Sequence, residues 1–189
     1  KYGEPVDFEY HDLIPLFKGD KFNADEWAEL FYLAGAKFAG PVAEHHDGYA
    51  MWDSSISPWN AKDTGPCRDI VGELADSIRK KELKFITTFH HARMGRATSD
   101  SSERDKRKWH YYGREKYFER TLPGYKDSDE LSKLYGTMPW DSFLKMWTKK
   151  LDEVIEQYRP DLIWFDSWLD RIPQKNRREF KAKKAIYTS

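Results

Sequence analysis

The sequence predicts an α/β protein that forms part of a (β/α)8 TIM-like barrel, with about three β-then-α units. Short apolar segments alternate with amphipathic helical segments, and acidic or histidine residues follow three of the apolar segments. Alternation of this kind implies a parallel sheet covered by helices. An open doubly wound sheet also fits, but no Gly-rich phosphate turn follows any of the three predicted strands. A whole barrel needs about 250 residues, so a chain of 189 residues is expected to hold only part of one.

The first unit begins with a helix predicted over Asn23 to Ala34, with Asn23 as its N-cap. At helical spacing, one face of this helix carries Trp27, Leu30, Phe31 and Ala34. Gly35 ends the helix, and residues 36–43 are predicted to form a strand that Gly40 and Pro41 weaken. The N-terminal segment, residues 1–21, does not resemble a first strand.

The second unit consists of a helix over 68–81 and a strand over 83–89. The helix carries an apolar stripe of Ile70, Val71, Leu74, Ala75 and Ile78. Residues 93–139 are polar, rich in tyrosine and longer than an ordinary loop, which predicts a functional insertion or lid.

A third helix is predicted over 140–158, where seven apolar residues recur at helical spacing. Pro160 follows it, and the next apolar segment, Asp161 to Trp168, is predicted to be a strand in which Asp166 follows large aromatic rings. Side chains alternate along a strand, so Trp164 and Asp166 should project to the same side. An aspartate that caps the following turn is the alternative for Asp166.

Functional side chains are expected at the carboxyl ends of the strands, where parallel α/β proteins bind their ligands. These ends carry Glu44 to Gly48, the pair His90 and His91, and Asp166 to Trp168. Four of the six histidines therefore lie at two of the three strand ends. Converging histidine and aspartate indicate either a metal site or a site for a ligand rich in hydroxyl groups.

The metal alternative requires three or four ligands with compatible directions. Neighbouring residues of a strand point to opposite faces, which argues against a shared ion on His45 and His46 or on His90 and His91. A carbohydrate site uses the same residues more easily. Imidazoles bind vicinal hydroxyls, tryptophan faces such as those of Trp52 and Trp164 pack on a sugar ring, and a carboxylate can attack an anomeric carbon.

Composition gives no indication of nucleic-acid or membrane binding. The formal net charge is zero with 34% charged residues, and 16% of the residues are aromatic. No apolar run is long enough for a membrane span, and the first residues do not read as a signal peptide. The single cysteine, Cys67, excludes an internal disulfide within the chain.

Three blocks of the sequence resemble glycoside hydrolase family 29, the α-L-fucosidases. They are AGAKFAGPVAEHHDGYAMWDSSISPWN, PCRDIVGEL followed by IRKKELKF, and YRPDLIWFDS, in the family's order and approximate spacing. The resemblance implies a partial catalytic barrel that hydrolyses terminal α-L-fucose with retention, acts on fucosylated glycans and needs no cofactor. It also implies a secreted, periplasmic or lysosomal protein, and it leaves the oligomeric state open.

Residue roles follow from the resemblance only where positions match. Asp166 corresponds to the catalytic nucleophile, His45 and His46 to the pair that binds the fucose hydroxyls, and Trp164 to an aromatic beside the sugar. The chain departs from the family at TTFHHAR, where a tyrosine is usual, so His90 or His91 is expected to replace a sugar contact.

The chain also lacks the family's upstream His-Trp-Gly segment, and the general acid/base of many members falls beyond Ser189. The chain alone is therefore expected to have weak activity or none. A non-catalytic fucose-binding module and a metal-dependent hydrolase that uses the histidine pairs remain the alternatives.

Overall fold

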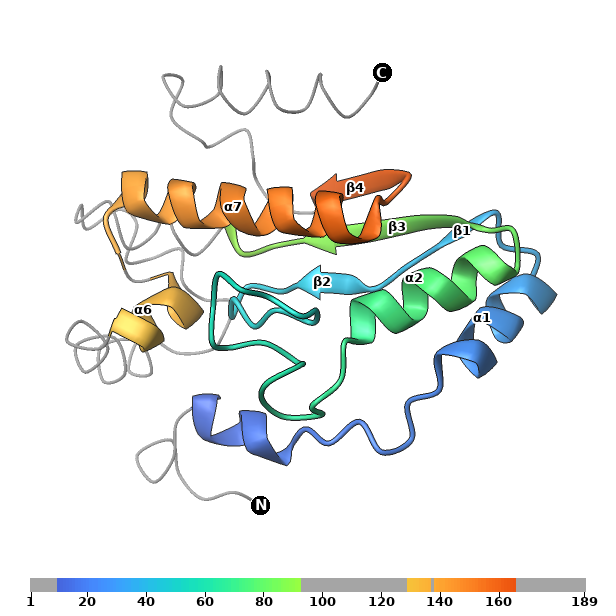
Figure 1. The fold of residues 1–189 in the computed structure, drawn as a ribbon, viewed down its shortest axis with the longest axis horizontal. Coiled ribbons are helices and arrows are strands. Elements are labelled where there is room, and N and C mark those ends of the chain that lie inside the picture. The colour runs from blue at the N-terminus through green and yellow to red at the C-terminus, as the bar shows by residue number, and fades with distance from the viewer. Residues whose placement is uncertain (1–9, 93–128, 137, 166–189) are drawn as a thin grey trace, which may run out of the picture.

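The computed structural model describes residues 10–92, 129–136 and 138–165 (Figure 1). The predictions for Asp166, for Trp168, for most of the 93–139 insertion and for a helix after about residue 174 fall outside the described residues. Within them the elements are a 3-10 helix η1 (Tyr10–Leu16), α1 (Ala24–Leu33), β1 (Phe38–Ala39), β2 (Val42–Glu44), α2 (Ile70–Lys80), β3 (Lys84–Phe89), α6 (Asp129–Tyr135), α7 (Trp140–Tyr158) and β4 (Leu162–Phe165).

The strands form one parallel sheet with β3 at its centre. β1 and β2 both pair with one edge of β3, and β4 pairs with the other edge. The break between β1 and β2 falls at Gly40 and Pro41, the two residues that weaken the predicted strand. The arrows of β2, β3 and β4 point the same way in Figure 1, so their carboxyl ends meet at one edge of the sheet. This is the strand–helix order of a (β/α) barrel, of which these elements form a part.

Helices cover one face of this sheet. Phe85, Thr87 and Phe89 of β3 are buried on that face, while the residues between them are only partly covered. α2 contributes its predicted apolar stripe, all of which is buried, and α7 contributes Trp147, whose ring lies 5.7 Å from that of Phe165. The opposite face is open: Val42, Leu162 and Trp164 of the outer strands are exposed there.

The strand register changes at the end of β2. Val42 pairs with Thr88, yet Glu44 pairs with Phe89, so a bulge lies between the two pairs. A bulge of one residue reverses the alternation of the side chains that follow it. Glu44 therefore shares the helix-covered side with Phe89.

The first helix packs differently from the prediction. Asn23 is its N-cap as predicted, since its side chain accepts from the backbone N–H of Asp25 and Glu26. The apolar face predicted from the sequence is covered only in part: Phe31 packs against the core, but Trp27 is 48% and Leu30 64% exposed, and the buried positions are Ala24 and Ala28. Small side chains let two helix backbones approach closely, which explains why the alanines lie in the contact with α2.

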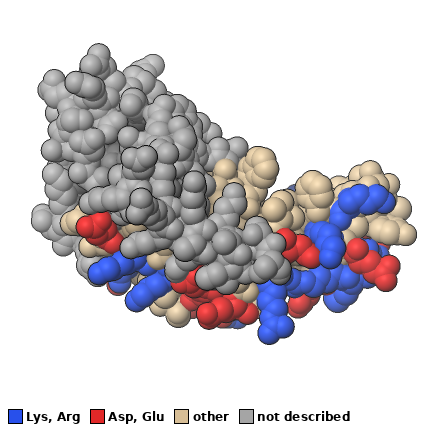
Figure 2. Space-filling view, turned by 90° about the horizontal axis from the view of Figure 1, so that it is seen from above, with Lys and Arg blue, Asp and Glu red and all other residues tan. Residues whose placement is uncertain are grey.

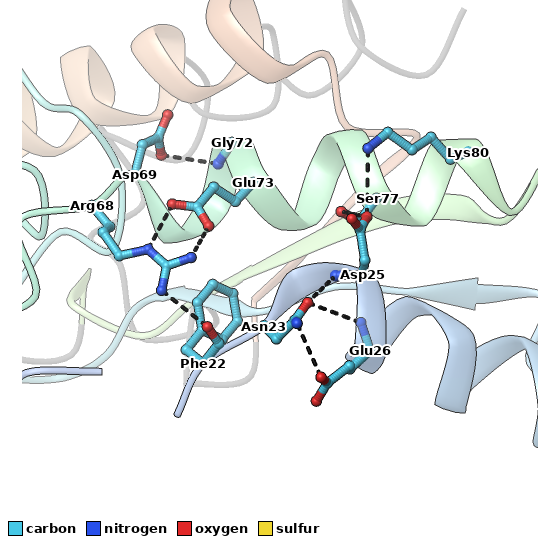
Figure 3. A network of polar contacts seen from close by, with 10 residues as sticks. All are labelled: Phe22, Asn23, Asp25, Glu26, Arg68, Asp69, Gly72, Glu73, Ser77 and Lys80. Carbon is cyan, nitrogen blue, oxygen red and sulfur yellow. Dashed lines mark hydrogen bonds and ion pairs between the residues drawn. The ribbon is translucent and has the colours of Figure 1, made fainter. Parts of the chain in front are cut away.

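Polar contacts join α1 to α2 and hold the start of α2 (Figure 3). Ser77 Oγ donates to Asp25 Oδ1 at 2.6 Å. Arg68 pairs with Glu73 and also donates to the Phe22 carbonyl at 2.9 Å, while Asp69 caps α2 by accepting from the Gly72 N–H at 2.9 Å. The RDIVGEL block thus contributes structure rather than chemistry: it starts α2 and ties it to the entry of α1.

Charges of both signs are interspersed on the described part of the face in Figure 2, with no broad area of one sign. Among the helices that the structure describes, none combines the length and the apolar character that a membrane span requires.

Candidate active site at the carboxyl edge of the sheet

The loop that follows β2 turns sharply at residues 45–49, which we call the histidine loop. The Gly48 N–H donates to the His45 carbonyl at 3.2 Å, and the Tyr49 N–H donates to Asp47 Oδ1 at 3.1 Å. Asp47 also accepts from the hydroxyl of Tyr10 in η1. The chain then returns along β2, because Met51 N–H donates to the Ala43 carbonyl at 2.9 Å. The loop is therefore a tight turn that hydrogen bonds connect to η1 and to β2.

Three imidazoles meet at this edge of the sheet. The rings of His45 and His90 are stacked with centroids 4.8 Å apart. The ring of His46 meets both edge-on, at 4.5 Å from His45 and 5.4 Å from His90. The His90 N–H donates to the Glu44 carbonyl at 2.9 Å, which holds the ends of β2 and β3 together. The structure thus brings together three of the four histidines that the sequence places at strand ends.

A cavity of about 350 Å³ opens beside this cluster. His45, Asp47 and Tyr10 line it together with mainly apolar side chains of η1 and of the β2 region. An apolar hollow beside polar groups suits a ligand with both a hydroxylated and a hydrophobic part.

The end of β4 lies beside the end of β3. Phe89 pairs in register with Phe165, and Thr88 pairs with Trp164. Trp164 is 55% exposed on the open face of the sheet, so its ring is accessible to a ligand. Asp166 lies outside the described residues, but in the chain it directly follows Phe165, as His90 follows Phe89 and His45 follows Glu44. Glu44, Phe89 and Phe165 form one row of paired residues across β2, β3 and β4. His45, His90 and Asp166 are the residues that follow this row in the sequence.

The fourth histidine, His91, is in a different environment. It is 0% exposed, its Nδ1 lies 3.3 Å from Glu44 Oε1, and its ring meets Phe143 of α7 edge-on at 5.1 Å. Burial alone would raise the pKa of the Glu44 carboxyl, but Lys150 and His91 outweigh burial and hold that pKa below its ordinary value. Glu44 is thus an ionised structural group, and the position of His91 does not support a direct sugar contact.

Trp52 also lies in the core, with 0% of its surface exposed. Its indole N–H donates to Glu153 Oε2 of α7 at 2.8 Å, and its ring lies 5.9 Å from that of Phe89. A buried ring has no free face to offer a sugar, so this position does not support the expected sugar contact either. The sequence predicts a sugar contact for both Trp52 and Trp164, and only their packing in the fold distinguishes the buried ring from the accessible one.

The objection to a shared ion on His45 and His46 rests on strand alternation and does not hold, because β2 ends at Glu44. Within the described ranges, nevertheless, no group of three His, Cys, Asp or Glu side chains is arranged to hold a metal ion.

Sequence reasoning missed two residues of α7 that support the site. Lys150 Nζ donates to Glu44 Oε1 and to the Gly48 carbonyl, the latter at 3.0 Å. Glu153 accepts from Trp52, Ser54 and the Ser55 backbone and hydroxyl at 2.7 to 2.8 Å. Lys150 lies seven residues after Phe143 and three after Trp147, so helical spacing places a charged residue in the buried stripe; that signal would have identified it.

Comparison with known proteins gives one consistent result. A family model described as "Alpha-L-fucosidase" matches residues 1–189. The tissue alpha-L-fucosidase of Bos taurus is 34% identical over 88% of the chain and that of Rattus norvegicus 33% identical over 96%, but the matches cover 29% and 33% of those proteins. The chain therefore spans about a third of the length of these relatives.

Among solved structures, the alpha-fucosidase of Thermotoga maritima in complex with a mechanism-based inhibitor is similar to the chain, with a TM-score of 0.68 and 28% identity. The match covers 99% of this chain and 37% of that one.

Proposed function

The chain belongs to the α-L-fucosidase family, and on this basis we propose that it supplies the fucose-binding and nucleophile-bearing part of a retaining α-L-fucosidase. The substrate would be a terminal α-L-fucose of a glycan or glycoconjugate. The observation that carries the proposal is the row Glu44, Phe89 and Phe165, because the residues that follow it in the chain are His45, His90 and Asp166. In the sequence, Asp166 directly follows Phe165, the last residue of β4.

In the proposed reaction a carboxylate oxygen of Asp166 attacks the anomeric carbon of fucose. The C–O bond to the leaving group breaks, its electron pair goes to the leaving oxygen, and that oxygen takes a proton from a general acid. Water then attacks the anomeric carbon and gives its proton to the conjugate base of that general acid. The bond between the anomeric carbon and Asp166 breaks, which releases the Asp166 carboxylate and fucose. No residue of this chain is assigned as the acid/base.

His45 and His46 would bind the sugar hydroxyls, with His90 as a third donor or acceptor from β3. An imidazole can donate from one ring nitrogen and accept at the other, which suits vicinal hydroxyl groups. Trp164 would pack against the apolar side of the sugar, as its exposed ring on the open face permits. His91 and Trp52 are left out of the proposed contacts because both are fully buried.

Covalent trapping tests this assignment. The chain is incubated with α-L-fucosyl fluoride, and its intact mass is measured. Fluoride leaves with little help from a general acid, a group whose contribution is typically about 10²- to 10⁴-fold, so the test does not depend on the unassigned residue. We expect one deoxyhexose to be added per chain.

The matched controls are Asp166→Ala and Asp53→Ala, the second removing an exposed carboxylate of the loop after β2. Label on the Asp53 variant and none on the Asp166 variant supports the nucleophile. Equal labelling of both variants, or an unlabelled wild-type chain, contradicts it. Saturable fucose binding without labelling would instead favour a non-catalytic fucose-binding module.

A further inference from the structure

Three titratable side chains that the proposed chemistry does not use form a buried cluster behind the histidine loop. Glu44 ends β2, His91 follows β3 and Lys150 belongs to α7; each is 0% exposed. The cluster lies on the helix-covered side of the sheet, whereas His45 lines the cavity together with Val42, which is exposed on the open face.

Lys150 contacts both sides of the turn formed by the histidine loop. Its ammonium group donates to Oε1 of Glu44, the residue before His45, and at 3.0 Å to the carbonyl of Gly48, the residue after Asp47. One side chain thus connects the two points between which His45 and His46 are placed. An ammonium has three donors, so Lys150 can contact both groups at once, and its backbone belongs to a helix of 19 residues.

His91 supports the same turn from behind. A Cβ at Gly48 would lie 2.4 Å from His91 Cε1 and 2.6 Å from its Nε2, so the imidazole ring packs directly on the backbone of the loop. His91 Nδ1 lies 3.3 Å from the carboxylate oxygen of Glu44 that Lys150 also contacts. The turn is therefore held both by the ion pair of Lys150 with Glu44 and by the His91 ring, which packs on Gly48.

A buried ion pair is a poor device for stability alone, since apolar side chains of similar volume often serve as well or better. What the pair adds is direction: it fixes the position of the Gly48 carbonyl and the side to which Glu44 turns. Glu44 is covalently joined to His45, so a fixed Glu44 also limits where the backbone of His45 can lie.

We propose that Lys150, acting through Glu44 and the Gly48 carbonyl, is a positioning residue that holds His45 and His46 in the orientation in which they bind the sugar. The proposal rests on the fucose-binding function proposed above. It also assigns His91 a supporting role in place of a sugar contact.

The test separates positioning from stability by removing both charges together. The variant Lys150→Met/Glu44→Gln leaves no uncompensated buried charge, and Lys149→Met changes the exposed neighbour on the same helix. L-Fucose affinity is measured by titration calorimetry on the full chain. We expect the double variant to bind about tenfold more weakly and the Lys149 variant to bind within about twofold of the wild type.

Amide hydrogen exchange gives a readout that does not need the sugar. The N–H groups of Gly48 and Tyr49 should exchange about tenfold faster in the double variant, because the loop loses its anchor. Those of Leu74 and Ala75 in α2 should be unchanged, which distinguishes a local effect from loss of the fold.

The outcomes are distinguishable. If the wild-type chain does not bind fucose, the proposed function fails. If the amide exchange of Gly48 and Tyr49 in the double variant equals that of the wild type, the positioning role fails, whatever the fucose measurement gives. Normal fucose affinity in the folded double variant overturns the proposal. If the double variant does not fold, the variant Lys150→Arg is measured in its place. Its larger, planar guanidinium group keeps the charge but cannot reproduce both contacts of Lys150. Fucose binding and loop exchange equal to the wild type in this variant would overturn the proposal.

Discussion

Gly35 and Gly48 have the same backbone conformation, with φ at +77°, but different surroundings. Gly35 follows α1 and has no atom within 4 Å of the position that a Cβ would take. At Gly48 that position is 1.9 Å from the Leu134 carbonyl oxygen. At Gly35 only the left-handed backbone favours glycine. At Gly48 the backbone favours glycine in the same way, and in addition there is no room for a Cβ.

Gly48→Ala is therefore expected to destabilise the chain more than Gly35→Ala. The Gly35 variant should lose about 1 kcal/mol of unfolding free energy, the cost of an alanine in the left-handed region. The Gly48 variant should lose at least about 3 kcal/mol, because backbone of α6 must also move. Urea denaturation measures both values, and equal losses would mean that the loop has room that the structure does not show.

Trp52 and Trp164 offer a second comparison of single residues. Trp52 is completely buried and bonded to Glu153, while Trp164 is more than half exposed on the open face of the sheet. The first belongs to the core and the second to the proposed site.

Trp52→Ala should lower the unfolding free energy by about 3–5 kcal/mol, as truncation of a core aromatic does. Trp164→Ala should change it by less than about 1 kcal/mol but should weaken L-fucose binding, since the ring covers a face of the sugar. Denaturation and calorimetric titration of both variants check the pair. A Trp164 variant with normal fucose affinity would exclude the ring from the sugar site.

Among the described elements, α7 links the core to the site. Trp147 of α7 packs against Phe165 of β4, and two charged residues of the helix, Lys150 and Glu153, contact Glu44 of β2 and the loop that follows it. Through these contacts the helix holds a segment about 100 residues earlier in the chain. The helix bounds, Trp140–Tyr158, agree with the prediction because the apolar period and the following proline mark them in the sequence.

The contact of α7 with β2 should make stability depend on pH. The pKa of the Glu44 carboxyl lies below its ordinary value of 4.5 in the folded chain, so the unfolded chain binds the proton more tightly. The contribution of Glu44 to the unfolding free energy is therefore complete above a pH of 4.5, the ordinary pKa of the group. It is lost as the pH falls through the lower pKa that Glu44 has in the folded chain. Lys150→Met/Glu44→Gln removes the titrating group.

The unfolding free energy of the wild type should therefore fall more between about pH 7 and pH 3.5 than that of the double variant. Urea denaturation at the two pH values measures both losses, and other carboxyls contribute equally to each protein. Parallel losses would show that the folded Glu44 carboxyl does not have the lowered pKa.

In the part of the molecule that the structure describes, charge is distributed in two ways. On the surface, charges of both signs are interspersed and form exposed pairs such as Lys84 with Asp161 at 3.0 Å. Inside, Lys150 and Glu44 pair with no exposure at all. Salt screens only the first kind, because its ions cannot enter the core.

Added salt should separate the two lysines. Lys84→Met should cost at most about 1 kcal/mol, and this cost should disappear in about 1 M NaCl. Lys150→Met leaves Glu44 buried without its partner and should cost about 3–5 kcal/mol at either salt concentration. Denaturation at low and high NaCl gives the four values; a cost for Lys150→Met that shrinks with salt would contradict the buried pair.

Local patterns in the sequence predicted most of the fold. The N-cap at Asn23, the apolar stripe of α2 and the strand predicted over 83–89 each depend on residues within a few positions, and the structure confirms them, with the strand over Lys84–Phe89. The apolar face of α1 was not predictable in this way. Its exposed Trp27 and Leu30 are more apolar than the buried alanines, and only the approach of α2 decides which side is covered.

Residue identity and local pattern were enough to predict the parallel β/α order, the family and the clustering of histidines at strand ends. Contacts between segments far apart in the chain determine which histidines converge, place Trp52 in the core with Trp164 accessible, and allow α7 to hold the histidine loop. Such contacts cannot be inferred from neighbouring residues, because they form only when the chain folds. At Glu44, for example, a register shift against β3 sets the side that the residue faces, and its partner Lys150 lies 106 residues later in the chain.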